Sequence, residues 1–432
     1  MEYMVKVSII VPSLNVADYI KECLDSIVGQ TLKEIEVICV DAGSEDGTLE
    51  IIKDYVKYDN RIELIISDKK SYGYQINLGI KNATGQYIGI VETDDFISKE
   101  MYEELYEYAI GAEAEVVKSD HYVFYGSSSN RIVQRSNLLN EKDYDLYNKI
   151  INYSKDIRVF NADLVSWSGI YLKDFLVRNN IMHNETPGAS FQDNGFWLQT
   201  MIYGNKIVYV NKAYYYLRRD NEKSSIYSIT KIDCLRDEYF FMRNCIIQRG
   251  MDKSILLQYL WNRKFEALEF DIRRNLYKYR LELIKKYSDD FRFAIENQEV
   301  TSTCKHYEQI LFLAYNPEKF YHKYYELNEN AIELITGVNS IFIYGAKVHA
   351  TKAFILINGF APNKVKGFLV SNKSENIKYH NNLPVLGIDE VLCDNEVLIV
   401  LAVSDKYLND IEDNLKQRNC QKYIYYKDLL FG

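Results

Sequence analysis

Residues 87–95 read Tyr-Ile-Gly-Ile-Val-Glu-Thr-Asp-Asp, and this stretch decides the fold. Its first half is apolar and rich in Ile and Val, which predicts a buried strand. The strand then stops at three carboxylates, those of Glu92, Asp94 and Asp95. Because burying an unpaired carboxylate is costly, such clusters belong at strand ends, where a cation can reach them. Carboxylate oxygens suit Mg²⁺ or Mn²⁺, and an ion held there could bind a diphosphate. The alternative is a solvated acidic turn before a helix that begins near Ser98.

Length and composition bound the possibilities. The chain has 432 residues, which predicts two or three domains, and its 47% hydrophobic and 26% charged residues are typical of a globular protein. A net charge of -9 argues against nucleic acid as the main partner. The seven cysteines are unclustered and are expected to be reduced thiols. The chain shows no signal-peptide pattern and no apolar run that could cross a bilayer, so we expect a cytoplasmic protein. A peripheral position at the inner face of the cell membrane is compatible with this.

Strand and helix patterns alternate through residues 5–120. Apolar runs predict strands before the acidic stretch at 7–11, 36–40 and 62–67. Helical spacing predicts helices between them at 18–28, 48–58 and 75–81. This alternation implies an α/β fold with an open, mainly parallel sheet, whose ligands bind at the carboxyl ends of the strands. Pro12 is expected to end the first strand. The polar or turn-forming residues that follow strands, and that we expect to converge on one cleft, are Pro12, Ser13, Asn15, Asp41 and 92–95.

Three upstream segments resemble a known family. They read Val-Ser-Ile-Ile-Val-Pro-Ser-Leu-Asn at 7–15, Ser-Ile-Val-Gly-Gln-Thr at 26–31 and Val-Asp-Ala-Gly-Ser-Glu-Asp-Gly-Thr at 40–48. In order and spacing they resemble the family 2 glycosyltransferases of the GT-A fold, and Asn77 with residues 83–87 continues the pattern. The match covers roughly the first half of the chain. The resemblance implies a nucleotide-diphospho-sugar donor, usually a UDP-sugar, a divalent metal, and inversion at the anomeric carbon.

The resemblance also implies roles for donor-binding residues. The region of Pro12, Ser13 and Asn15 would contact the base together with Asp41, which can accept the ring N–H of uracil. Asp41 could instead be a turn residue that caps the next helix. Ala42 stands where the family often has a second aspartate.

The acidic motif departs from the family's usual Asp-x-Asp-Asp. Glu92 occupies the first acidic position, and its longer side chain can still accept a ribose hydroxyl or a metal-bound water. We therefore expect the metal, Mn²⁺ or Mg²⁺, on Asp94 and Asp95, with Glu92 and Thr93 on the donor side.

A second informative stretch reads Ser-Phe-Gln-Asp-Asn-Gly-Phe-Trp at 190–197. Its carboxylate, Asp193, lies among aromatic residues just before a helix expected at 196–203. Such a setting can raise the pKa of a carboxyl toward values useful to a general base. The stretch is similar to the family's Glu-Asp signature, whose aspartate takes the proton of the acceptor hydroxyl, with Gln192 in place of the glutamate. Asp193 could also cap the helix, and the two roles are compatible.

Arginines follow a tyrosine-rich run at 214–217. Relatives carry a similar stretch, from Arg218 and Arg219 to Ser224, that closes over the donor diphosphate, and the planar arginine fork can bind two phosphate oxygens. The alternative is a basic pair that faces solvent at the end of a strand. Upstream, Trp167 is expected in the core rather than as a platform for sugar.

The rest of the chain divides into two further segments. We expect a GT-A domain at 1–228, a helical region at 229–335 and a small Rossmann-like domain at 336–432. The last carries only Gly345 of the dinucleotide fingerprint. Basic residues of the helical region could face anionic lipid or simply be solvated; they are Arg263, Lys264, Arg273, Arg274, Lys278 and Arg280.

These patterns predict an inverting, metal-dependent glycosyltransferase. It would act on a UDP-sugar and a glycan or lipid-linked acceptor in surface polysaccharide synthesis, and a homo-oligomer is compatible with the sequence. A nucleotidyltransferase is one alternative, but residues 12–15 lack the Gly-rich basic loop expected of it. Another is a catalytically weak nucleotide-sugar-binding or scaffold protein, which the departures at Ala42, Glu92 and Gln192 would allow.

Overall fold

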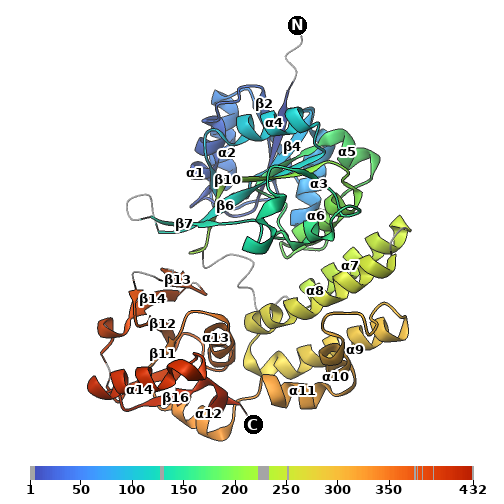
Figure 1. Ribbon diagram of the computed structural model, residues 1–432. Coiled ribbons are helices and arrows are strands. Elements are labelled where there is room, and N and C mark those ends of the chain that lie inside the picture. The colour runs from blue at the N-terminus through green and yellow to red at the C-terminus, as the bar shows by residue number, and fades with distance from the viewer. Residues whose placement is uncertain are drawn as a thin grey trace. The chain divides into compact units, whose positions relative to one another are not determined.

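The computed structural model describes residues 5–126, 131–221, 233–250, 253–373, 376, 378–381, 383–392 and 394–430. The chain divides into two compact units (Figure 1). The first comprises Met1–Ser225 and Cys234–Gln248, and the second comprises Ile226–Asp233 and Arg249–Gly432.

A mixed sheet organises the first unit, with the order β3-β2-β1-β4-β9-β6-β10-β5. Its strands are β1 (Val7–Ser13), β2 (Ile35–Asp41), β3 (Ile62–Ile66), β4 (Tyr87–Ile90), β5 (Phe96–Ile97), β6 (Val116–Tyr125), β9 (Gly169–Leu172) and β10 (Ile207–Arg218). Two short strands extend it, β7 (Ile132–Ser136) beside β6 and β8 (Ile150–Ile151) beside β10. Neighbouring strands β1 to β4 are parallel, β9 is antiparallel to β4 and β6, and β10 is parallel to β6. The expected α/β fold is confirmed. The sheet is parallel over β3-β2-β1-β4 and between β6 and β10, but β9, β5, β7 and β8 pair antiparallel, so it is mixed rather than mainly parallel.

Helices accompany this sheet, and the first five of them contact its strands. The helices are α1 (Ile20–Val28), α2 (Thr48–Tyr58), α3 (Tyr72–Asn82), α4 (Met101–Ala112), α5 (Lys173–Arg178), α6 (Gln192–Tyr203) and α7 (Cys234–Arg249). In α1 the buried residues Ile20, Cys23, Leu24 and Ile27 recur at helical spacing and join the core cluster with the apolar side chains of β1 and β2. Burial of this stripe explains why the segment is helical.

Pro12 does not end the first strand, contrary to the expectation. It pairs in register with Val40, and β1 continues to Ser13. In the described part of the chain, β4 pairs with β1 only as far as Ile10, so at Pro12 the ladder continues on the β2 side. Proline is tolerated where a strand has a free side, because its missing N–H then removes no ladder bond.

The second unit combines helices with a smaller sheet. Its helices are α8 (Lys253–Arg274), α9 (Arg280–Glu296), α10 (Tyr307–Tyr315), α11 (Pro317–Tyr324), α12 (Glu329–Thr336), α13 (Val348–Phe360) and α14 (Leu408–Gln417). The sheet has the order β13-β14-β12-β11-β15-β16. Its strands are β11 (Ser340–Tyr344), β12 (Val365–Val370), β13 (Tyr379–His380), β14 (Leu383–Gly387), β15 (Val397–Leu401) and β16 (Tyr423–Tyr425). All neighbours except β13 and β14 are parallel, which confirms the Rossmann-like character.

Helix α7 groups with the first unit, whereas α8 to α12 group with the C-terminal sheet. Arg280 of α9 is fully buried and donates to the carbonyl of Ile355 in α13. The boundaries predicted at 228/229 and 335/336 remain predictions.

The predicted basic surface of the helical region is partly wrong. Lys264 is fully buried and donates to Asp290 Oδ2 over 2.9 Å, and Arg280 is buried as well. Lys264 shares a helix face with the buried Trp261 and Leu268, three residues before it and four after, so its helical position directs it inward. Within the described ranges, no helix has both the length and the hydropathy of a membrane span.

The cysteines also depart from expectation at one position. Cys420 is disulfide-bonded, so the chain does not carry reduced thiols throughout. The free cysteines among the described residues are Cys23, Cys39, Cys234, Cys245 and Cys304.

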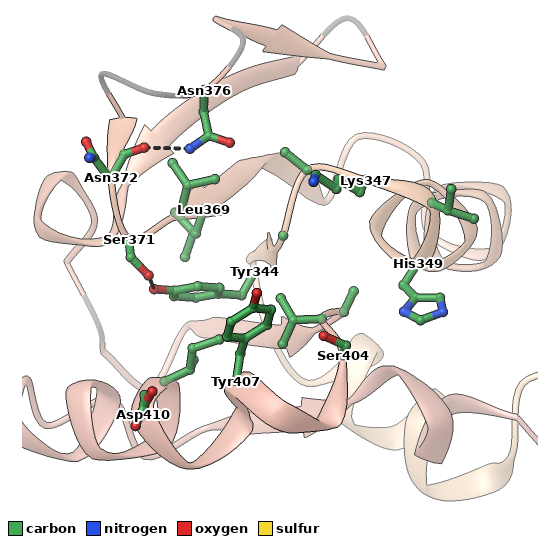
Figure 2. A pocket seen from close by; sticks show the side chains of 17 residues that line it. Tyr344, Lys347, His349, Leu369, Ser371, Asn372, Asn376, Ser404, Tyr407 and Asp410 are labelled. Atoms are coloured by element: carbon green, nitrogen blue, oxygen red, sulfur yellow. Dashed lines mark hydrogen bonds between the residues drawn. The ribbon is translucent and has the colours of Figure 1, made fainter. Parts of the chain in front are cut away.

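A cavity of about 790 Å³ opens at the carboxyl ends of β11, β12 and β15 (Figure 2). The chain turns from β11 to α13 through Gly345, whose φ of 121° is unfavourable for other residues. Tyr344 and Tyr407 lie at its centre, and the Tyr344 hydroxyl lies 2.9 Å from Ser371 Oγ. Lys347 occupies the place of the second glycine of the dinucleotide fingerprint, so the cavity lies at a ligand-binding position of the fold without that motif.

Candidate functional site

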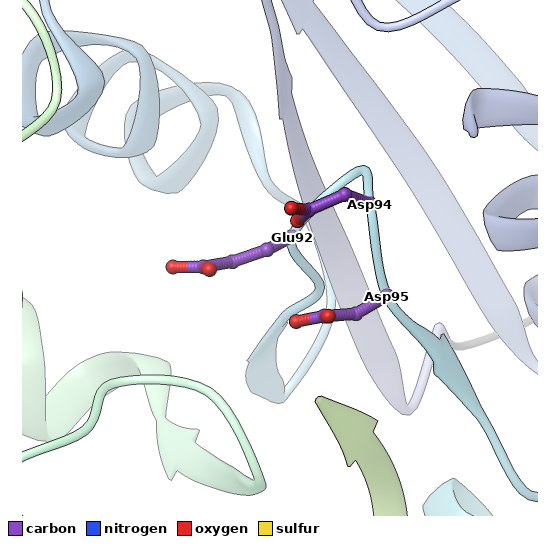
Figure 3. A group of neighbouring side chains, drawn as sticks. All are labelled: Glu92, Asp94 and Asp95. Atoms are coloured by element: carbon purple, nitrogen blue, oxygen red, sulfur yellow. The ribbon is translucent and has the colours of Figure 1, made fainter. Parts of the chain in front are cut away.

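Three carboxylates gather directly after β4 (Figure 3). Glu92, Asp94 and Asp95 each offer an oxygen, and the three oxygens lie within 4.8 Å of one another. Burial and the charge of Asp94 raise the pKa of Glu92 to about 8. Burial and the same neighbour also raise the pKa of Asp95 well above its usual value. Carboxylates crowded in this way fit a divalent cation, which would supply positive charge and favour their ionised forms.

Strand β10 holds this cluster in place. Tyr215 donates from its hydroxyl to Asp95 Oδ2 over 2.7 Å, and its hydroxyl oxygen accepts the N–H of Glu92 over 3.0 Å. Trp167 stacks on the Tyr215 ring with centroids 4.5 Å apart and is 5% exposed. The prediction that Trp167 belongs to the core is confirmed.

Arg218 lies beside the cluster, but its fork binds protein groups. Its N–H donates to Asp95 Oδ1 over 2.7 Å, its Nε donates to the Asp94 carbonyl over 2.9 Å, and its Nη2 donates to Glu22 Oε2 over 2.9 Å. Arg219 is close enough for its positive charge to oppose part of the rise in the pKa of Glu92. Arg218 therefore supports the acidic loop, while the predicted diphosphate contacts remain predictions.

The predicted base-binding residues meet at the neighbouring ends of β1 and β2. The Asp41 side chain is fully buried. Its Oδ1 accepts the N–H groups of Gly43 and Ser44, each over 2.8 Å, and its Oδ2 accepts the hydroxyls of Ser13 over 2.7 Å and Ser44 over 2.6 Å. The turn role is thus observed, and contact between Asp41 and a base remains a prediction.

Asn15 ties the loop after β1 to the turn after β2. It has a φ of 54°, its Oδ1 accepts the Glu45 N–H over 2.9 Å, and its own N–H donates to Ser44 Oγ over 2.8 Å. Thr93 is buried, and in the sequence it lies between Glu92 and Asp94. Ser224 lies outside the described residues. Ser13, Asn15 and Asp41 thus meet at the ends of β1 and β2. Their convergence with residues 92–95 on one cleft, and their donor contacts, stay predictions.

Asp193 lies in the first turn of α6. Burial raises its pKa to about 6, while its own N–H, the N–H of Asn194 and the charge of Lys118 oppose that rise. The helix begins earlier than predicted, and Phe191 is its N-cap with a φ of 62°. Asp193 is therefore not the N-cap residue, although its carboxylate does accept N–H groups of the first turn. Its negative charge raises the pKa of Glu92, so the predicted base lies near the predicted metal site.

Two residues of this region were not singled out from the sequence. Tyr72, at the start of α3, donates to Glu92 Oε1 over 3.1 Å. Lys118 is fully buried in β6 and donates to the Val165 carbonyl over 2.8 Å and to Tyr171 over 3.0 Å. Burial lowers the pKa of Lys118 to about 7. Lys118 could have been singled out from the sequence, because it is a lysine within an apolar run. No sequence pattern points to Tyr72.

The contacts of Gln192 explain why a glutamine stands where the family pattern has a glutamate. It is buried, and its Nε2 donates to Thr186 Oγ1 and to the Gly188 carbonyl, each over 3.0 Å. Its Oε1 accepts the Ser190 N–H over 2.5 Å. An ionised glutamate has no donor for the first two contacts, so the amide suits this loop.

Comparison with known proteins agrees with this arrangement. Residues 8–166 match the family model described as Glycosyl transferase family 2. "Glycosyltransferase GlyG" of Streptococcus pneumoniae serotype 4 is 28% identical over 297 residues, which is 66% of this chain and 93% of that protein. "Poly(ribitol-phosphate) beta-glucosyltransferase" of Bacillus spizizenii is 29% identical over 228 residues, which is 51% of this chain but 34% of that protein.

A solved structure shares the fold. S. aureus TarS 1-349 in complex with UDP-GlcNAc matches with a TM-score of 0.57 at 21% identity, over 75% of this chain and 94% of that chain. Sequence family, sheet topology and structural likeness therefore agree. Residues 8–166 therefore carry a domain of the family 2 glycosyltransferases, and the first unit has the GT-A fold.

Proposed function

We propose that this chain is an inverting, metal-dependent glycosyltransferase. It would move a sugar from a UDP-sugar to a hydroxyl of a glycan or lipid-linked acceptor in the synthesis of a surface polysaccharide, such as a capsule or exopolysaccharide. One observation carries the proposal: three carboxylates that fit one cation lie near Asp193, whose charge raises the pKa of Glu92. Transfer of a sugar from a diphosphate needs a cation for the leaving group and a base for the acceptor.

Asp94 and Asp95 would hold Mn²⁺ or Mg²⁺, with Glu92 placed to accept a ribose hydroxyl or a metal-bound water. The bound ion would offset the negative charge of the diphosphate. The UDP-GlcNAc in the TarS complex supports a uridine diphosphate donor, and the name of the poly(ribitol-phosphate) relative supports a polymeric acceptor.

Asp193 would accept the proton of the acceptor hydroxyl. The hydroxyl oxygen would then form its bond to the anomeric carbon from the face opposite UDP, while the carbon–oxygen bond to UDP breaks, which inverts the configuration. A pKa of about 6 leaves the carboxylate largely ionised at neutral pH yet basic enough to take a proton.

A catalytically weak nucleotide-sugar-binding or scaffold protein is the second candidate. The internal hydrogen bonds of Asp41 and Arg218 favour it, because both side chains are occupied by protein groups. A donor could use either side chain only after those contacts rearrange.

The test begins with a screen of UDP-sugars for Mn²⁺-dependent hydrolysis and then compares wild type with Asp193→Asn. The substitution keeps the size of the side chain but removes the proton acceptor. We expect transfer to fall by about 10²- to 10⁴-fold, with UDP affinity and melting temperature near wild type.

Transfer by Asp193→Asn within a few-fold of wild type would show that the base lies elsewhere. Glu185 would then be tested next; its Oε1 accepts from Asn77 over 3.1 Å and its Oε2 lies 3.3 Å from Lys69. A wild-type protein that binds UDP but neither hydrolyses nor transfers from any donor would support the second candidate.

A further inference from the structure

Helix α7 carries a buried carboxylate that the proposed chemistry does not use. Glu238 is 1% exposed, and buried carboxylates are rare unless they are paired. Its Oε1 accepts the N–H of Gly195 over 2.8 Å, and its Oε2 accepts from Asn184 Nδ2 over 2.9 Å. Gly195 lies two residues after Asp193, and Asn184 lies nine residues before it. One side chain thus joins both sides of the segment that carries the proposed base.

Gly195 is required by this contact. A Cβ at this position would lie 2.4 Å from Glu238 Oε1 and 2.6 Å from ring atoms of Phe241. Glycine weakens a helix relative to alanine, so its place in the first turns of α6 needs a reason. The close approach of α7 is that reason, and it puts Glu238 directly on the backbone of α6.

In the first turn of α6, the Asp193 carboxylate accepts its own N–H and that of Asn194. Among the residues that the structure describes, no side chain of the N-cap Phe191 binds the amides that follow. Gln192 instead holds the preceding loop through Ser190 and Gly188, and Glu238 holds Gly195. Asp193 lies between these two anchors, so the direction of its carboxylate depends on both.

We propose that Glu238 is a positioning residue that fixes the first turn of α6 and thereby aims Asp193 at the acceptor hydroxyl. This inference rests on the proposed role of Asp193 as the base. Burial raises the pKa of Glu238 to about 8, opposed by its hydrogen bonds with Asn184 and Gly195. Its acceptor oxygens, rather than a full negative charge, are therefore what the site uses, and a neutral glutamine can replace it.

The test uses the full chain with Mn²⁺ and the UDP-sugar found by the donor screen. Glu238→Ala removes both acceptor oxygens, whereas Glu238→Gln keeps a carbonyl oxygen for Gly195. We expect Glu238→Ala to lower kcat by about 10- to 100-fold without changing UDP affinity, because misplacing a group by about 1 Å can cost about 10²-fold. Glu238→Gln should return kcat to within about threefold of wild type. Asp237→Ala, which removes an exposed acid from the same helix, is the matched control and should not change kcat.

A double-mutant cycle separates positioning from general stability. If Glu238 acts through Asp193, then Glu238→Ala should cause little further loss in the Asp193→Asn background. An equal loss in both backgrounds, or a Glu238→Ala kcat within twofold of wild type, would overturn the inference. Should Glu238→Ala not fold, Glu238→Asp takes its place, since the shorter side chain cannot span both donors. Absence of transfer by wild type would defeat the proposed function itself. Equal transfer by wild type and Glu238→Ala would defeat only this inference.

Discussion

Tyr215 donates a hydrogen bond of 2.7 Å to Asp95, although 120 positions separate the two residues in the sequence. Both side chains are buried. The acidic loop after β4 is thus built against β10, and the Tyr215 hydroxyl oxygen also accepts the N–H of Glu92. Because one hydroxyl of β10 makes both contacts, it holds the Asp95 carboxylate next to the backbone of Glu92.

Asp95→Asn should abolish transfer and weaken UDP binding in Mn²⁺, because an amide does not supply the anionic charge that a divalent ion requires. The melting temperature should change little, because the amide loses one of two acceptor oxygens but also relieves the burial and the repulsion by Asp94 that disfavour an ionised Asp95. Tyr215→Phe is the matched control, which removes both hydrogen bonds of the Tyr215 hydroxyl but keeps the Asp95 carboxylate, and its loss of UDP affinity should be smaller. Calorimetry with and without Mn²⁺ measures the UDP affinity of both variants. Equal UDP affinity of wild type and Asp95→Asn under both conditions would reject the metal assignment.

Arg218→Ala and Arg219→Ala should have different effects. The Arg218 side chain is 9% exposed and binds Glu22 and the Asp94 carbonyl, so its removal should destabilise the fold by about 1–3 kcal/mol. Arg219→Ala should mainly weaken UDP binding. Melting curves and UDP titrations of both variants check this. Reduced UDP affinity of Arg218→Ala at a wild-type melting temperature would show instead that its fork turns to the diphosphate when donor binds.

Local patterns predicted much of the first unit. The helix expected at 48–58 is α2 with the same bounds, and the three carboxylates do follow a buried strand, because periodicity and strand ends are local properties. The contacts that position the site could not be predicted in this way. Tyr215 with Asp95 and Glu238 with Gly195 depend on which distant elements become neighbours, and residue spacing does not encode that order. The same holds for Lys264. The sequence places it in a highly charged helix, but it does not reveal that Asp290 is its buried partner.

A truncated chain that ends at Gly250 should fold and keep donor hydrolysis. This residue ends α7 with a φ of 84°, and α7 belongs to the first unit. A chain that ends before Ser340 should be less stable, because it retains Arg280 but loses the α13 segment on which that buried side chain packs. Circular dichroism melts and UDP titrations compare the two. A folded chain ending at Gly250 that no longer binds UDP would place part of the donor site in the remainder of the protein.

The pH dependence of kcat tests Asp193 and its neighbour Lys118 together. A base must be ionised to accept a proton, and burial raises the pKa of Asp193 to about 6. At saturating donor, kcat should therefore fall as the pH drops through about 6, by about tenfold per pH unit below it. The positive charge of Lys118 lowers the pKa of Asp193, so Lys118→Met should move this acid limb to higher pH. Lys118 has a pKa of about 7 and is mostly charged in the range where Asp193 titrates, so the shift should be measurable.

Lys206→Met is the control. It removes an exposed lysine that pairs with Glu113 and should leave the acid limb of kcat in place. UDP affinity measured at each pH separates this effect from titration of the acidic cluster. Identical acid limbs for wild type and Lys118→Met, or a limb that persists in Asp193→Asn, would assign the titration to another group.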